Sequence, residues 1–188
     1  MWTYDNRPLD DDLIYLKKQY DNNLKKEEYE KYRIRKWDLR FLRLTRDIAG
    51  FSKDKSTKVG SIIVDKDNII VSTGFNGLPQ KCKDLPERLD NREIKLQIIL
   101  HAEINSILFA KRDLTNCIIY TWPFLSCSNC TSMIIQSGIT RVITIHNDNP
   151  RWKDNFGISL ELYEEAKIPV IFYNEEEIFT QKNKREDL

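Results

Sequence analysis

The chain has 188 residues and a mass of 22.4 kDa, which is the size of one ordinary domain. Its 30 basic and 29 acidic residues give a formal net charge of +1, which argues against a dedicated nucleic-acid binder, because such proteins usually carry a clear excess of Lys and Arg. No apolar run approaches the roughly 18 residues that span a bilayer, and residues 1–12 carry charges where a signal peptide needs an apolar centre. We therefore expect a cytosolic protein that acts on small molecules, with neither a membrane nor a nucleic acid as partner.

Charge and apolar periodicity divide the chain into three segments. Residues 1–36 mix both charge signs at high density. Four apolar residues recur there at helical spacing: Leu13, Leu16, Tyr20 and Leu24. We expect a charged helical extension, either an arm for subunit contact or regulation, or a solvated helix that lies on the core. Residues 37–174 carry the regular pattern of a domain, and residues 175–188 form a charged tail that we expect to fray.

The domain begins with a predicted helix and a predicted hairpin. The helix has one apolar face and can end at Gly50; the face consists of Trp37, Phe41, Leu44 and Ile48. The β-branched runs 59–65 and 69–73 are joined by a short polar turn, which predicts two antiparallel strands. Residues 74–91 are polar, hold several Gly and Pro, and are long for a plain connection, so they are a candidate binding loop.

The remainder of the domain alternates between helices and strands. The predicted order is a helix over about 101–112, a strand 117–122, a helix over about 127–137, a strand 141–146, a helix over about 156–167 and a strand 170–173. Strand–helix–strand units of this length impose parallel pairing. The last three strands should therefore extend the hairpin into a mixed five-stranded sheet covered by helices, an α/β fold.

The residues that carry chemistry stand at the starts of two predicted helices. The motif His101-Ala102-Glu103 opens one, and Cys127 and Cys130 open the next. Helix starts in such a sheet gather at the carboxyl ends of the strands, so the imidazole and the two thiolates can meet. Together they offer three ligands to zinc. Because structural zinc sites normally have four protein ligands, an open fourth position indicates a catalytic metal.

Glu103, the acidic residue of the first motif, has a predicted role different from that of a ligand. At a helix start Glu103 can turn toward the metal site without being a ligand and can relay protons. Hydrolysis of an amino-substituted ring is then the natural reaction.

The other cysteines and the second histidine have simpler interpretations. We expect Cys82 to be a loop thiol, Cys117 a buried strand residue and His146 a surface side chain. Three aromatic residues could wall a base-binding pocket or fill the core: Tyr120, Trp122 and Phe124.

Together these motifs resemble the deoxycytidylate (dCMP) deaminase family. The zinc-deaminase signature, His-x-Glu followed by Pro-Cys-x-x-Cys, is met except that Ser126 stands in the place of the proline. Further matching stretches are Trp37-Asp38 through Phe41-Leu42, Ser52 to Gly60, Gly74 to Pro79, His101 to Ala110 and Ile135 to Ile139. The resemblance covers Trp37 to Tyr173. It implies the three-layer α/β/α cytidine deaminase-like fold over residues 37–174, and zinc-dependent hydrolysis of dCMP to dUMP and ammonia, which feeds thymidylate synthesis. The family occurs in viruses as well as cells, so the expected cytoplasm is that of the host if the source is a virus.

The resemblance also implies roles for individual residues. His101, Cys127 and Cys130 would be the zinc ligands and Glu103 the proton shuttle. The amide of Ala102 would meet the pyrimidine carbonyl, the carbonyl of Ser126 would accept from the amino group of the base, and Asn76 would hold the sugar hydroxyl, although it could also be a turn residue. Without the proline, a rigid φ at the helix entrance is lost. Asn105 also matches the family, and the basic residues near the predicted loops are Lys58, Lys81, Lys83, Arg88 and Lys95.

Family members are often homo-oligomers, dimers or hexamers, that dCTP activates and dTTP inhibits, with Mg²⁺ accompanying the effector; here residues 78–90 would form the effector loop. Several alternatives stay open at this point. The substrate could be another free cytosine nucleotide or nucleoside, guanine, or a modified dCMP. A base in tRNA is disfavoured by the balanced charge, and a non-catalytic nucleotide-binding protein is disfavoured because Glu103 and all three candidate ligands are present.

Overall fold

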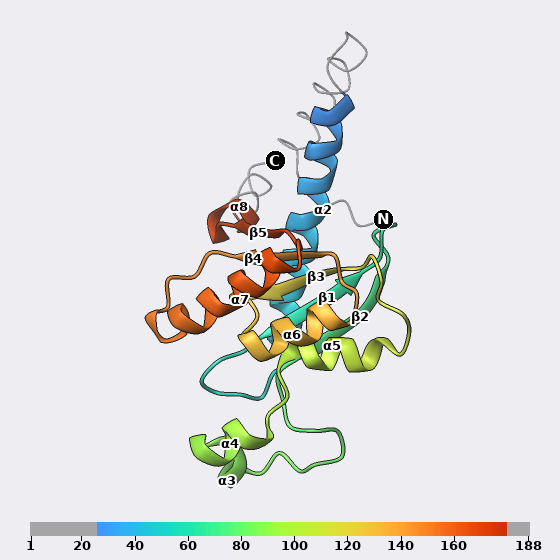
Figure 1. The fold of residues 1–188 in the computed structure, drawn as a ribbon. Coiled ribbons are helices and arrows are strands. Elements are labelled where there is room, and N and C mark those ends of the chain that lie inside the picture. Colours follow the sequence, from blue (N-terminus) through green and yellow to red (C-terminus); the bar gives the residue numbers. More distant parts are fainter. Residues whose placement is uncertain (1–25, 180–188) are drawn as a thin grey trace, which may run out of the picture.

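The computed structural model describes residues 26–179 (Figure 1). The helical spacing noted over residues 13–24 lies outside these residues. The first described element is α2 (Lys26–Ala49), and Gly50 follows it as predicted. This helix runs without interruption through residue 36. Residues 26–36 are therefore the first turns of the same helix whose later turns pack on the sheet.

Five strands form one mixed sheet: β1 (Gly60–Val64), β2 (Ile70–Phe75), β3 (Ile118–Trp122), β4 (Arg141–Ile145) and β5 (Val170–Tyr173). They lie in the order β2-β1-β3-β4-β5. The pairs β1–β2 and β1–β3 are antiparallel, whereas β3–β4 and β4–β5 are parallel. The predicted hairpin and the predicted parallel extension are both confirmed.

Helices cover both faces of this sheet (Figure 1). One face carries α2 and α8 (Glu175–Phe179), and the other carries α5 (Ala102–Ala110), α6 (Ser128–Gln136) and α7 (Lys153–Glu165). Alternate side chains of each strand enter the two cores, since Ile62 and Val64 pack on the α2 side and Ile63 on the other. The predicted three-layer α/β/α arrangement is confirmed.

One short helix lies in the segment expected to be a binding loop, and a second follows it. Residues 74–91 include the end of β2 and α3 (Pro86–Leu89), and α4 (Arg92–Ile98) follows directly. An antiparallel bridge between Gly77 and Leu100 closes the base of this excursion, which extends away from the sheet in Figure 1. Apolar periodicity gave no sign of α4, because its one buried residue is Lys95 while Ile94 and Leu96 are exposed.

The expectation of a frayed tail from residue 175 is wrong for residues 175–179. These residues form α8, in which Ile178 is fully buried in the core beside α2. The Arg43 side chain of α2 also donates to the Ile178 carbonyl at 2.6 Å. One apolar side chain within an acidic run therefore anchors the chain end. A 3₁₀ turn, η1 (Pro150–Trp152), leads into α7, which begins a few residues earlier than predicted. Within residues 26–179, no helix is long and apolar enough to cross a membrane.

Candidate metal centre and active-site cavity

The two helix starts that carry the predicted ligands meet at one edge of the sheet. His101 is the N-cap residue of α5 and Cys127 the N-cap residue of α6. Because β2 and β3 run in the same direction on either side of β1, their carboxyl ends share this edge. Gly74 of β2 allows α5 to lie close, since a Cβ there would come within 2.2 Å of the Ala102 carbonyl oxygen. The positions of the two motifs in the sequence and the directions of the strands thus bring His101 and Cys127 to the same edge of the sheet.

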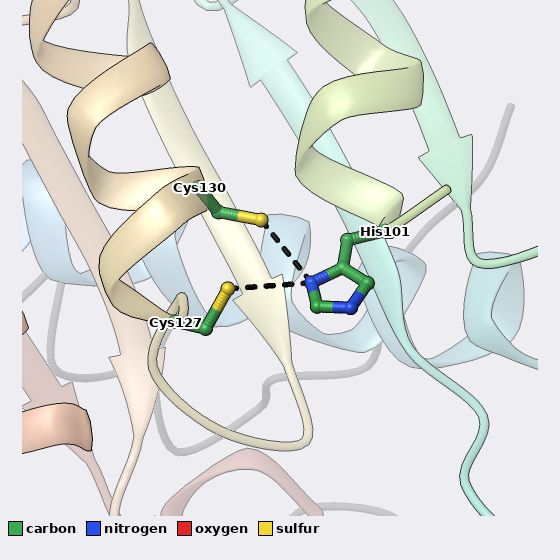
Figure 2. A group of neighbouring side chains, drawn as sticks. All are labelled: His101, Cys127 and Cys130. Atoms are coloured by element: carbon green, nitrogen blue, oxygen red, sulfur yellow. Dashed lines mark hydrogen bonds between the residues drawn. The ribbon is translucent and has the colours of Figure 1, made fainter. Parts of the chain in front are cut away.

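Three potential metal ligands lie together in this position (Figure 2). His101 Nδ1 is 3.3 Å from the Sγ atoms of both Cys127 and Cys130, and the three atoms lie within 4.8 Å of one another. Tetrahedral zinc, with bonds of about 2.3 Å to sulfur and about 2.0–2.1 Å to nitrogen, places such atoms about 3.6 Å apart. One imidazole and two thiols at this spacing fit a zinc ion with one coordination position left for another molecule.

The electrostatics of the group favour negative sulfur. A hydrogen bond from the Cys130 thiol, together with the contact to His101, lowers the pKa of Cys127 to about 4. The same shared proton and burial raise the pKa of Cys130, and the contact with Cys127 raises the pKa of His101. The start of α6 adds the favourable end of a helix dipole at Cys127. A cation at this position would replace the shared proton.

Glu103 lies in the first turn of α5 and lines the cavity in front of this group. It is 3% exposed, and its Oε2 atom has no hydrogen-bond partner among the described residues. Burial raises the pKa of this carboxyl above its ordinary value. A buried carboxyl oxygen without a partner is costly in a protein interior, so its place beside the three potential ligands makes Glu103 a candidate for proton transfer.

The cavity has a volume of about 250 Å³, and an aromatic cluster forms one wall. Phe124, Trp152 and Phe156 contact one another with ring centroids 5.7 to 6.0 Å apart. Of the three aromatic residues that the sequence offered as wall or core, Phe124 is in the wall. Tyr120 and Trp122 belong to the core on the α2 side. They point there because alternate residues of β3 face opposite sides of the sheet.

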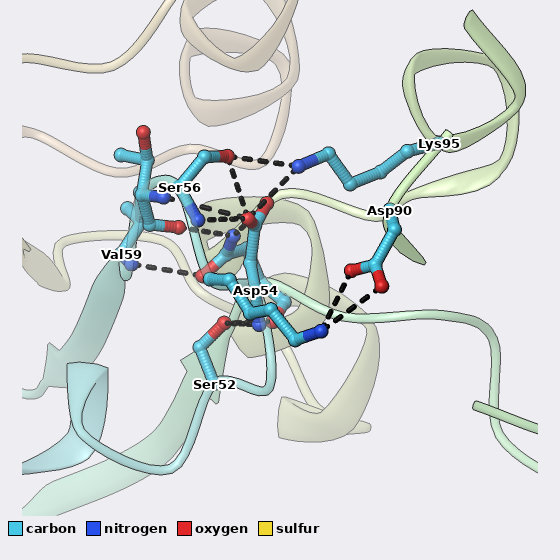
Figure 3. A network of polar contacts seen from close by, with 9 residues as sticks. Ser52, Asp54, Ser56, Val59, Asp90 and Lys95 are labelled. Carbon is cyan, nitrogen blue, oxygen red and sulfur yellow. Dashed lines mark hydrogen bonds and ion pairs between the residues drawn. The ribbon is translucent and has the colours of Figure 1, made fainter. Parts of the chain in front are cut away.

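A buried ion pair lines the cavity, and Figure 3 shows the polar network around it. Lys95 of α4 donates to Asp54 at 2.9 Å and to the Ser56 hydroxyl at 2.8 Å. Burial alone would raise the pKa of Asp54, but the hydrogen bonds from Lys95 and Ser56 outweigh it and lower that pKa. Sequence reasoning missed Asp54, because nothing in the local pattern pairs it with a lysine 41 residues away.

The basic residues that line the cavity differ from those expected from the sequence. Lys95 lines it, whereas the other four basic residues near the predicted loops do not: Lys58, Lys81, Lys83 and Arg88. Arg92 and Arg151 do line it, and sequence reasoning did not single them out.

Asn76 lines the cavity, and its amide is engaged in holding the neighbouring loop. Its Oδ1 accepts from the Val59 amide at 2.8 Å, and its Nδ2 donates to the Thr57 carbonyl at 2.9 Å. Ala102 and Ser126 are fully buried, and the roles expected of them use main-chain atoms. Asn105, which had no derived role, donates to the Phe75 carbonyl at 2.8 Å and so joins α5 to the end of β2.

The remaining candidate residues lie apart from the cavity. Cys117 is buried in the core and Cys82 is an exposed thiol. His146 is exposed and stacks on Phe172 with ring centroids 4.9 Å apart. The simple interpretations of these three residues are confirmed.

Comparison with known proteins identifies the family. Residues 35–146 match the model of the cytidine and deoxycytidylate deaminase zinc-binding region. A protein of Aliivibrio fischeri, described as an uncharacterized deaminase in the luxG 3′ region, is 42% identical over 140 residues, which cover 73% of this chain and 93% of that protein. A probable deoxycytidylate deaminase of Caenorhabditis elegans is 37% identical over 134 residues, covering 69% and 66% of the two chains.

The fold agrees with solved structures. The apo dCMP deaminase of cyanophage S-TIM5 matches with a TM-score of 0.57 and 19% identity, covering 72% of this chain and 96% of that one. The same enzyme in complex with dCMP and dUMP matches with a TM-score of 0.53 and 22% identity, covering 81% and 99%. The predicted cytidine deaminase-like fold is confirmed. The chain belongs to the cytidine and deoxycytidylate deaminase family and is a hydrolytic deaminase.

Proposed function

We propose that this protein hydrolyses dCMP to dUMP and ammonia with the help of zinc, and that the dUMP feeds thymidylate synthesis. One observation carries the proposal. A buried carboxyl with an unpartnered oxygen, Glu103, lines the cavity beside a group of one imidazole and two thiols. The relatives named as deoxycytidylate deaminases, and the phage enzyme solved with dCMP and dUMP, support this choice of substrate.

The ligands of the zinc would be His101, Cys127 and Cys130. When bound, zinc supplies a Lewis acid that makes a water molecule acidic enough to attack the ring at neutral pH. In the overall reaction a carbon–oxygen bond from water replaces the carbon–nitrogen bond of the amino group. Glu103 accepts the protons of the water and delivers one to the ring nitrogen, which keeps it in dUMP, and the other to the amino group, which leaves as ammonia; this role suits a carboxyl whose pKa burial has raised.

The charges around the cavity support a substrate that carries a phosphate. Lys95 and Asp54 neutralise each other, but Arg92 and Arg151 form no ion pair with any residue between 26 and 179. Two guanidinium groups that lack carboxylate partners are available to bind phosphate oxygens. Asn76, the amide of Ala102 and the carbonyl of Ser126 are the proposed contacts to the sugar and the base.

Assembly, regulation and location belong to the same proposal. We expect a homo-oligomer, a dimer or hexamer, that responds to dCTP and dTTP with Mg²⁺. The protein is expected to work in the cytoplasm, where its cysteines, none of which forms a disulfide among the described residues, would stay reduced. Size-exclusion chromatography with light scattering, run with and without each effector, measures the assembly directly.

The test of the reaction is a substrate panel. Purified protein of known zinc content is offered dCMP, CMP, deoxycytidine, cytidine, dCTP and guanine, and ammonia release and the ultraviolet change are followed with and without each effector. We expect the highest kcat/KM for dCMP. Zinc-loaded protein that deaminates only a different compound, or a base in tRNA, would contradict the proposed substrate while leaving the family assignment in place.

A further inference from the structure

Helix α7 presents three polar side chains to the turn that carries the two cysteines. Asn155, Ser159 and Tyr163 are spaced four residues apart, so they lie on one face of the helix. We call them the polar stripe of α7. The three side chains make no hydrogen bond to His101 or Glu103; their partners lie in the turn.

Each member of the stripe makes a hydrogen bond to the turn. Asn155 accepts from the Ser128 amide at 2.9 Å and donates to the Ser128 hydroxyl at 3.0 Å. Ser159 donates to the Ser126 carbonyl at 2.9 Å. The Tyr163 hydroxyl lies 2.7 Å from the Ser126 hydroxyl, which is 3.0 Å from the Thr131 hydroxyl.

These contacts fall on the residues that flank the candidate ligands. Ser126 directly precedes Cys127, Ser128 directly follows it, and Thr131 directly follows Cys130. Ser126, Thr131 and Ser159 have no exposed surface, and Tyr163 is 1% exposed. Buried hydroxyls must keep their partners, so the network admits little movement of the turn.

Ser126 occupies the place of the proline in the zinc-deaminase signature. A proline holds φ near −65° without any partner, whereas a serine leaves φ free. Here the serine hydroxyl and carbonyl are both tied to α7. Contacts with α7 therefore restrain the backbone at the position where the signature restrains it through the proline ring.

We propose that the polar stripe of α7 positions the turn that carries Cys127 and Cys130, and that it compensates for the missing proline. Asn155, Ser159 and Tyr163 are thus positioning residues, which act on the metal through the turn and not as ligands. The inference rests on the proposed zinc site. Outer-shell groups that orient metal ligands commonly change metal affinity by about 10–100-fold when they are removed.

The central variant is Tyr163→Phe, because it keeps the ring in the core and removes only the hydroxyl that contacts Ser126. We expect the zinc affinity of the purified holoenzyme, measured by competition with a chromophoric chelator, to fall by about tenfold. Asn155→Ala, at a half-buried position with little packing to lose, should weaken zinc binding in the same direction.

A matched control separates positioning from a general loss of stability. Tyr120 is also 1% exposed, and its hydroxyl also makes a 2.7 Å hydrogen bond, to Asp38 on the opposite face of the sheet. Tyr120→Phe should lower the unfolding midpoint at least as much as Tyr163→Phe, because it takes a hydrogen bond from a buried carboxyl. It should nevertheless leave zinc affinity within about twofold of the wild type, because its partner lies outside the network that holds the turn.

Restoring the proline provides the decisive comparison. Ser126 makes no hydrogen bond through its main-chain amide to the residues described in the structure, so Ser126→Pro removes none there. It does remove the Ser126 hydroxyl, whose remaining partner in Tyr163→Phe is the Thr131 hydroxyl, so the fixed φ of proline has to outweigh the loss of that contact. In the Tyr163→Phe background, Ser126→Pro should return zinc affinity to near the wild-type value. Three results would each overturn the inference. The first is a wild-type zinc affinity in Tyr163→Phe, the second is a loss of zinc affinity in Tyr120→Phe as large as that in Tyr163→Phe, and the third is no recovery of zinc affinity when Ser126→Pro is added to Tyr163→Phe. A wild-type protein that binds no zinc would instead contradict the proposed function, so the two failures are distinguishable.

Discussion

The buried ion pair between Lys95 and Asp54 lines the cavity and joins α4 to the loop before β1, and its contribution to stability can be measured. The variant Lys95→Met keeps a long apolar stem but leaves the Asp54 carboxylate buried without its cation. The two side chains are only 10% and 6% exposed. Removing one partner of a buried pair costs about 3–5 kcal/mol. Asp54 retains hydrogen bonds from the Ser56 amide and hydroxyl, so we expect the lower end, about 3 kcal/mol.

A neighbouring pair supplies the control. Lys55 and Asp90 also lie 2.9 Å apart and join the same two segments, but their side chains are 74% and 48% exposed. Lys55→Met should therefore cost about 1 kcal/mol or less. Urea unfolding followed by tryptophan fluorescence gives both free energies of unfolding. Equal costs in the two variants would refute the argument that burial makes the Lys95–Asp54 pair different.

The pH dependence of the same variants has a definite sign. In the wild type the pKa of Asp54 lies below its ordinary value of 3.8, so the ionised carboxyl stabilises the fold above that value, and the stabilisation is lost as the pH falls through the lower folded pKa. In Lys95→Met, the hydrogen bond and the charge of Lys95 no longer lower the pKa of Asp54, so this pKa rises and the carboxyl takes up a proton more readily as the pH falls. The stability difference between variant and wild type should shrink between about pH 7 and about pH 4. A difference that grows on acidification would contradict this account.

Two further predictions concern the cavity and the packing of α5. Arg92→Gln and Arg151→Gln should each raise KM for dCMP by about tenfold, the loss of one charge-assisted hydrogen bond, and leave kcat/KM for deoxycytidine unchanged in steady-state assays; equal effects on both substrates would exclude a phosphate contact. Gly74→Ala should lower the melting temperature and the zinc content together, because its Cβ would clash with the Ala102 carbonyl, whereas Gly157→Ala, with open space around it, should stabilise the protein by about 0.5–1 kcal/mol. Retained zinc and stability in Gly74→Ala would show that α5 does not depend on this close approach.

The strands along the chain and the three candidate ligands could be predicted from the sequence because both depend on local signals. Alternating β-branched runs specify the strands, and Cys127 and Cys130 stand at a recognisable helix start. The rule that parallel strands bring their carboxyl ends together then places His101 near them. In the structure the three side chains lie together at this edge of the sheet.

The rest of the site depends on contacts between distant segments. Lys95 looks like one charge among many on a short polar helix, and only the tertiary structure buries it against Asp54. Ile178 lies in an acidic run whose composition is typical of a solvated tail, so its burial could not be predicted from the sequence. The polar stripe of α7 reads as ordinary helix surface until Ser126 is placed against it. Such pairings leave no periodic signal in the sequence, because each partner alone is compatible with an exposed position.

The turnover of dCMP by Glu103→Gln, measured together with the zinc content of the variant, tests whether Glu103 carries the proton. Gln keeps the size of the side chain but cannot carry the proton, so we expect wild-type zinc stoichiometry with kcat reduced by about 10²–10⁴-fold. Cys127→Ala, the companion variant, should lose both zinc and activity. Near-normal turnover by zinc-loaded Glu103→Gln would contradict the role of Glu103 as the proton carrier.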